Sequence, residues 1–121
     1  MEDRMRQRIL GFSRQLAIEE QDRLEAAGTL VDLELLTAEI GDELSRQLAA
    51  QVLTQRSDAV AAKAVQACPD CQQECPVEPD REPLILQGIR GEIEYQEPRC
   101  YCPRCRRAFF PSGGPTAAPS A

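Results

Sequence analysis

Hydrophobic residues in the first half of the chain recur at helical spacing. An apolar residue every three or four positions makes one helical face, first at Met5, Ile9, Phe12 and Leu16. A longer stripe with similar spacing follows at Leu33, Leu36, Ile40, Leu44, Leu48 and Val52. Residues 2–65 contain no proline. The pattern therefore predicts a helical region over residues 1–66.

Three residues indicate where these helices begin and end. Gly28 suits the position that follows a helix C-terminus, and Thr29, with Asp32 three residues later, resembles a capping box that opens a second helix. Ser57 is a candidate N-cap for a last short helix that runs through Gln66. Two long helices joined by a tight turn predict an antiparallel hairpin. Its remaining apolar stripe is either ordinary intramolecular core or a surface for the C-terminal region, a missing domain or a second copy.

The second half of the chain has the pattern of short strands. Residues 83–87 form an apolar run, and residues 92–96 alternate between polar and apolar positions. Gly88 and Gly91, between the two runs, are typical of a hairpin loop. Residues 99–102 predict a third strand that leads into a pair of cysteines.

The cysteines carry the clearest chemical signal. The chain has six cysteines and no histidine, and Cys68-Pro-Asp-Cys71 and Cys102-Pro-Arg-Cys105 form two C-P-x-C motifs. Two residues between the thiols let one tight turn aim both sulfurs at a single point, so two such turns supply the four ligands of a structural zinc ion. Zinc supplies on the order of 10–16 kcal/mol of folding free energy, which a module with so few apolar residues needs.

Two further cysteines lie outside these motifs. On an extended strand Cys100 points the same way as Cys102, so it is either a spare ligand or a neighbour of Cys75. The alternative, which we favour, is that Cys75 and Cys100 are two small buried thiols. A redox role for the C-x-x-C pairs requires a thioredoxin-like βαβ context that this sequence lacks.

These patterns predict an α+β protein in three parts. A helical hairpin within residues 1–66 precedes a small antiparallel zinc ribbon at residues 67–111, and residues 112–121 lack apolar periodicity and predict a disordered tail. The charged N-terminus leads into no apolar run, and no stretch approaches the roughly 20 apolar residues of a membrane span. We therefore expect no membrane association and a cytoplasmic location.

The stretch from Cys68 to Pro111 resembles the N-terminal zinc ribbon of bacterial insertion-sequence transposases of the ISKra type. The shared order is a C-P-x-C motif, a glycine-containing hairpin, a second C-x-x-C motif and the ending Phe109-Phe110-Pro111. The helical segment 40–44 also resembles the part that precedes that ribbon. The resemblance implies a role in DNA transposition. Because such transposases continue into a large catalytic domain, we expect this chain to be their non-catalytic N-terminal part, truncated or encoded apart from its catalytic partner.

The net charge of the chain and the positions of its arginines are compatible with two functions. The net charge of −6 argues against a nucleic-acid coat, but four arginines surround the last cysteines without an acid among them: Arg99, Arg104, Arg106 and Arg107. The first hypothesis is that they contact DNA phosphates, and its electrostatic alternative is that they offset the thiolate charge of the zinc site. The second hypothesis is a protein-interaction module, whose helices bind a separately encoded catalytic subunit or a second copy.

Overall fold

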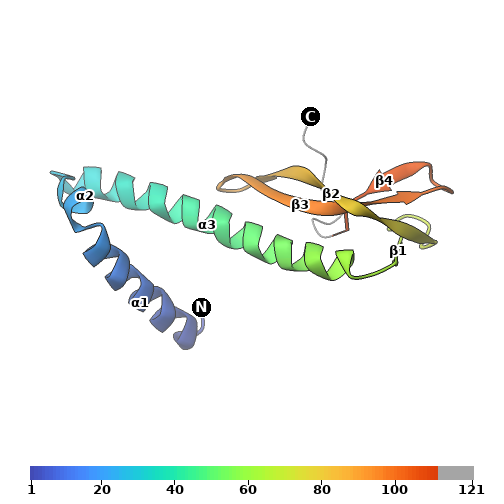
Figure 1. The fold of residues 1–121 in the computed structure, drawn as a ribbon. Coiled ribbons are helices and arrows are strands. Elements are labelled where there is room, and N and C mark those ends of the chain that lie inside the picture. Colours follow the sequence, from blue (N-terminus) through green and yellow to red (C-terminus); the bar gives the residue numbers. More distant parts are fainter. Residues whose placement is uncertain (112–121) are drawn as a thin grey trace. The chain divides into compact units, whose positions relative to one another are not determined.

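The computed structural model describes residues 1–111, so the predicted disordered tail lies outside the described residues. The α+β prediction is confirmed, because helices precede a four-stranded antiparallel sheet with the strand order β1-β2-β3-β4 (Figure 1). The helices are α1 (Asp3–Glu19), α2 (Gln21–Glu25) and α3 (Leu30–Ala61). The strands are β1 (Val65–Ala67), β2 (Glu74–Gly88), β3 (Gly91–Cys102) and β4 (Arg107–Phe109).

The chain forms two compact units that divide between Gly41 and Asp42. We call residues 1–41 the helical unit and residues 42–111 the ribbon unit. The division falls inside α3, so the C-terminal part of that helix belongs with the sheet. Among the described residues no helix is both long and apolar enough to cross a membrane.

The helical unit has a helix at each predicted apolar stripe, and it also contains the short helix α2, which was not predicted. Thr29 caps α3 as expected, because its Oγ1 accepts a hydrogen bond of 3.1 Å from the Asp32 backbone N–H. The expected stop at Gly28 is wrong: α1 ends at Glu19 and the short helix α2 ends at Glu25. No residue of α1 is buried, so its apolar face lies open to solvent in the single chain.

Ser57 does not begin a new helix, which corrects the predicted N-cap. It lies inside α3, fully buried, and its Oγ donates a hydrogen bond of 2.7 Å to the Gln96 carbonyl oxygen on β3. The helix ends at Ala61 rather than Gln66, because Val65–Ala67 pair with β2 as strand β1. A local capping pattern was thus overridden by a tertiary contact.

The predicted hairpin is confirmed as the turn between β2 and β3. Gly88 pairs with Gly91 across the turn, and Gly91 has a φ of 120°, which residues with side chains rarely adopt. The expected third strand at residues 99–102 is instead the end of β3, which continues without a break from Gly91. The pairing of β2 with β3 shifts register between Val77 and Arg81, in a segment of β2 that carries a proline.

The ribbon unit has a small apolar core between α3 and the sheet. Its buried members are Leu53, Leu84, Tyr95 and Phe110, and Leu84 pairs with Tyr95 across β2 and β3. In Figure 1 the green C-terminal part of α3 runs alongside this hairpin. The helix buries Leu53, Ser57 and Val60, which differ from the predicted stripe.

The predicted stripe of α3 lies on another face of the helix. Leu44, Leu48 and Val52 remain 37–58% exposed, whereas the buried residues of the same segment face the sheet. At about 100° per residue the two sets are roughly 140° apart around the helix axis. The sheet therefore cannot cover the stripe.

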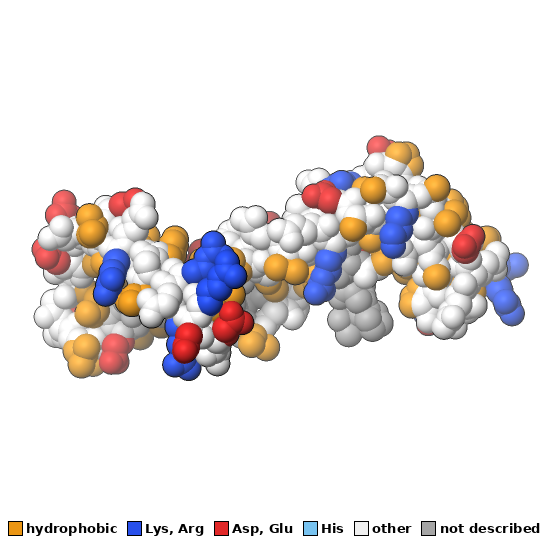
Figure 2. All heavy atoms as spheres, turned by 90° about the horizontal axis from the view of Figure 1, so that it is seen from below, with side chains coloured by type: hydrophobic (Ala, Val, Ile, Leu, Met, Phe, Trp, Pro, Cys, Tyr) orange, Lys and Arg blue, Asp and Glu red, His pale blue; other side chains and the backbone are white. Residues whose placement is uncertain are grey.

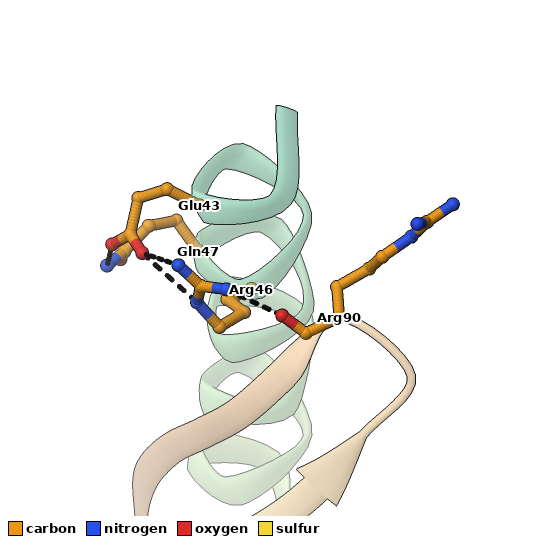
Figure 3. Close-up of polar contacts among 4 residues, drawn as sticks. All are labelled: Glu43, Arg46, Gln47 and Arg90. Carbon is orange, nitrogen blue, oxygen red and sulfur yellow. Dashed lines mark hydrogen bonds and ion pairs between the residues drawn. The ribbon is translucent and has the colours of Figure 1, made fainter. Parts of the chain in front are cut away.

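A second contact holds the tip of the hairpin to α3 (Figure 3). The Arg46 Nη1 donates a hydrogen bond of 2.5 Å to the Arg90 carbonyl oxygen, while its Nε donates to Glu43 Oε2 at 3.1 Å. Hydrogen bonds from Gln47 and Arg46 lower the pKa of the Glu43 carboxyl, which keeps it charged beside Arg46. A Cβ on Gly91 would lie 3.0 Å from Arg46 Nη1, so the close approach depends on this glycine.

Candidate metal centre

Both C-P-x-C motifs fold into tight turns that end in the same way. The residue after the second cysteine of each motif has a left-handed backbone, with a φ of 62° at Gln72 and 55° at Arg106. In the second turn the Cys105 backbone N–H donates a hydrogen bond of 3.3 Å to the Cys102 sulfur. In the first, the Gln72 N–H donates to the Cys68 carbonyl oxygen at 2.8 Å. The repeated backbone shape points two sulfurs of each turn toward one place.

The four sulfurs of these motifs converge as the sequence predicted. All lie within 4.8 Å of one another, with 3.9 Å between the Cys68 and Cys105 Sγ atoms and 3.6 Å between those of Cys71 and Cys102. A tetrahedral zinc ion with Zn–S bonds of about 2.3 Å needs sulfurs about 3.8 Å apart. The measured separations lie on both sides of that value. The four cysteines therefore form a group that could hold one metal ion.

The antiparallel sheet brings the two turns together. Cys68 follows β1 and Cys102 ends β3, while Cys71 lies in the turn before β2 and Cys105 in the turn before β4. Cys68 and Cys102 are buried, and the other two are half-buried. All six cysteines are free thiols, so no disulfide competes for the sulfurs.

An ion pair joins the two turns beside the sulfurs. The Arg107 guanidinium contacts the carboxylate of Asp70, which occupies the variable position of the first motif. Sequence reasoning assigned no role to Asp70. The sequence did carry a signal for this pair, because it places an acid in the first turn and an arginine directly after the second. These two residues face each other once a shared ion brings the turns together.

Two cysteines of this group differ in how readily their thiols ionise. The N–H bond from Cys105 lowers the pKa of the Cys102 thiol to about 6. In contrast, the proton shared with the Cys71 sulfur, together with burial, raises the pKa of Cys105 to about 12. The Cys102 thiol thus loses its proton readily, whereas the Cys105 thiol keeps its proton. A bound cation would favour the thiolate form of both Cys102 and Cys105.

Cys75 and Cys100 lie next to this group but outside the set of four. Both are fully buried, and Cys75 packs against Cys68 and Cys102. Burial raises the pKa of each of these two thiols to about 11, so they stay protonated at neutral pH. The Cys75 Sγ donates a hydrogen bond of 3.3 Å to the Gln73 carbonyl oxygen. These properties are those of buried thiols.

The four arginines near the second motif fall into two kinds. Arg99 pairs with Glu78 and Glu82 on β2, at 3.7 Å and 3.9 Å, and Arg107 pairs with Asp70. Arg104 and Arg106 are exposed, and neither forms an ion pair with any residue in the range 1–111. Two of the four arginines are thus engaged by the protein's own acids.

The arrangement of the four cysteines is compatible with a metal ion bound by sulfur alone. Four cysteine sulfurs fill a tetrahedral coordination sphere, which leaves no position for an activated water. Comparison with known proteins adds no further assignment: no protein-family model, no curated protein and no solved structure matches the chain.

Proposed function

We propose that this chain is a non-catalytic zinc-ribbon module whose helical unit binds another protein chain. One structural zinc ion, held by Cys68, Cys71, Cys102 and Cys105, folds the sheet. The observation that carries the proposal is the convergence of these four sulfurs within 4.8 Å of one another. Four thiolates make a closed site, which is typical of structural zinc.

We further propose that the module works in the cytoplasm within a transposase-like system. The order of helices, ribbon and Phe109-Phe110-Pro111 is the basis of the resemblance to ISKra-type transposases. In that setting the module positions a catalytic domain, and its helices provide the contact surface. The exposed apolar residues of α1 and α3 support this role, because a surface of that kind is typical of binding sites for protein partners.

DNA contact is the second candidate function. The exposed Arg104 and Arg106 favour it, because an arginine fork pairs well with phosphate oxygens. The net charge of −6 and the ion pairs of Arg99 and Arg107 favour the protein-interaction role.

A salt titration of the zinc-loaded chain against random duplex DNA separates these two functions. If Arg104 and Arg106 alone contact phosphates, the slope of log affinity against log salt is about −1.8, and the Arg104→Gln/Arg106→Gln variant removes it. The protein-interaction role predicts no measurable duplex binding even at low salt. A slope near −3.6 would instead show that Arg99 and Arg107 also leave their acids to bind DNA, and would overturn the ranking.

A further inference from the structure

The helical unit presents an apolar face that no part of the described range 1–111 buries. On α1, Met5 is 51%, Ile9 44% and Phe12 50% exposed, although their spacing places them on one face. On α3, Leu33 is 37% exposed, and Leu36 and Ile40 of the same stripe are half-buried. Figure 2 shows hydrophobic side chains reaching the surface among charged ones. Two amphipathic helices of one unit thus both keep their apolar faces in solvent.

The two faces carry opposite charge. Helix α1 has four arginines and two acids, whereas residues 30–41 of α3 have three acids and no lysine or arginine. Arg4 and Arg8 border the apolar face of α1, and Glu34 and Glu39 border that of α3 on its two sides. All four side chains are exposed, and none forms an ion pair with another residue of the described chain. The two faces are both apolar, and the charges beside them are complementary.

We propose that α1 of one copy of the chain packs on the α3 stripe of a second copy, and that the same contact repeats in the opposite direction. The pair is symmetric, because each copy gives one basic helix and receives another. The inference rests on the proposed protein-interaction function and names its partner as a second copy of this chain.

The chain's own α3 is the competing partner for α1. No residue of α1 is buried within the helical unit, so its own α3 leaves the face open. A helix of a second copy approaches without the constraint of the short connection at residues 20–29. The exchange of an element that could also fold back on its own chain is a common route to dimers.

Complementary charge reversals test the pairing in the zinc-loaded full chain. One variant carries Arg4→Glu and Arg8→Glu, and the other carries Glu34→Lys and Glu39→Lys. Each variant alone places like charges along both contacts of a pair, so we expect self-association to weaken by about tenfold or more. Mixed in equal amounts, the variants have opposite charges at both contacts, and we expect a 1:1 complex. Sedimentation velocity over a range of concentrations measures each species.

Control variants test whether self-association depends on the proposed contact between α1 and α3. Arg14→Glu changes charge on the side of α1 roughly opposite its apolar face, and we expect unchanged self-association. Phe12→Ser removes an apolar contact without a charge change, and we expect the same loss as for the reversals. Zinc content is measured in every sample, so a failure of the metal site is recognised apart from a failure of pairing.

Three results would overturn the proposal. The first is a wild-type chain that stays monomeric at every concentration. The second is self-association that neither charge reversal weakens. The third is a mixture of the two variants in which no 1:1 complex forms, as expected if α1 folds back on its own α3.

Discussion

The helical unit and the ribbon unit both lack a large apolar core, and they differ in what else they offer for stability. Neither has a large core: α1 buries no residue, and the apolar cluster of the ribbon unit has four buried members. The ribbon unit adds four converging sulfurs, so a metal ion can supply the stabilisation that burial does not. Residues 1–41 contain no such group. The helical unit instead exposes an apolar face that charged residues border. Under the proposed function, the ribbon unit gains its stability from an ion and the helical unit gains its stability from a partner chain.

Removal of the metal should produce the largest difference between the units. Cys68→Ser, or a strong chelator, should unfold β2 and β3, because structural zinc contributes on the order of 10–16 kcal/mol. Helix α3 has 32 residues and should keep much of its helical signal without the sheet. Amide dispersion in two-dimensional NMR and far-UV circular dichroism measure the two effects.

The matched control for this change is the Cys75→Ser/Cys100→Ser variant. Both residues are buried, so some loss of stability is expected, but zinc should remain at one ion per chain. Loss of zinc from this variant would show that the ligand set is wrong.

Truncation of one apolar residue in each unit should give the next largest contrast. Leu84 is fully buried, so Leu84→Ala should lower the unfolding free energy of the zinc-loaded chain by about 2–5 kcal/mol. Phe12 is half exposed, and Phe12→Ala should cost under about 0.5 kcal/mol at concentrations where the chain is monomeric. Urea unfolding in excess zinc measures both. Equal losses would mean that α1 is packed as tightly as the ribbon core.

The contact between Arg46 and the hairpin tip should give the smallest effect. Arg46→Ala removes the hydrogen bond to the Arg90 carbonyl oxygen, and we expect a loss of about 1 kcal/mol. Arg56→Ala is the control, since Arg56 is an exposed arginine of the same helix. Hydrogen exchange at the Gly91 amide should become faster only in the first variant. Equal exchange rates in the two variants would show that the contact does not hold the tip.

Much of this structure could be predicted because its signals are local. Cysteine spacing indicated which four sulfurs converge, alternation and paired glycines indicated the β2–β3 hairpin, and the Thr29 cap was visible in four residues of sequence. Each of these features depends on residues within one turn or one strand.

The errors arose where distant residues decide the outcome. Ser57 resembles an N-cap, but its hydroxyl bonds Gln96, 39 positions later. The spacing of Leu44 and Leu48 left open whether their stripe is core, and the sheet packs against Leu53 on another side of the helix. The left-handed residues Gln72 and Arg106 were not predicted, because neither is the glycine that usually signals such a backbone.

The most direct test of the account is zinc K-edge X-ray absorption on the reduced, freshly purified chain, with the metal content measured on the same sample. We predict one zinc per chain and a first shell of four sulfurs at about 2.3 Å. The Cys102→Ser variant should lose the ion or one of the four sulfurs. A chain without zinc, or a shell in which nitrogen or oxygen replaces any of the sulfurs, would contradict the central claim that Cys68, Cys71, Cys102 and Cys105 hold a structural zinc ion.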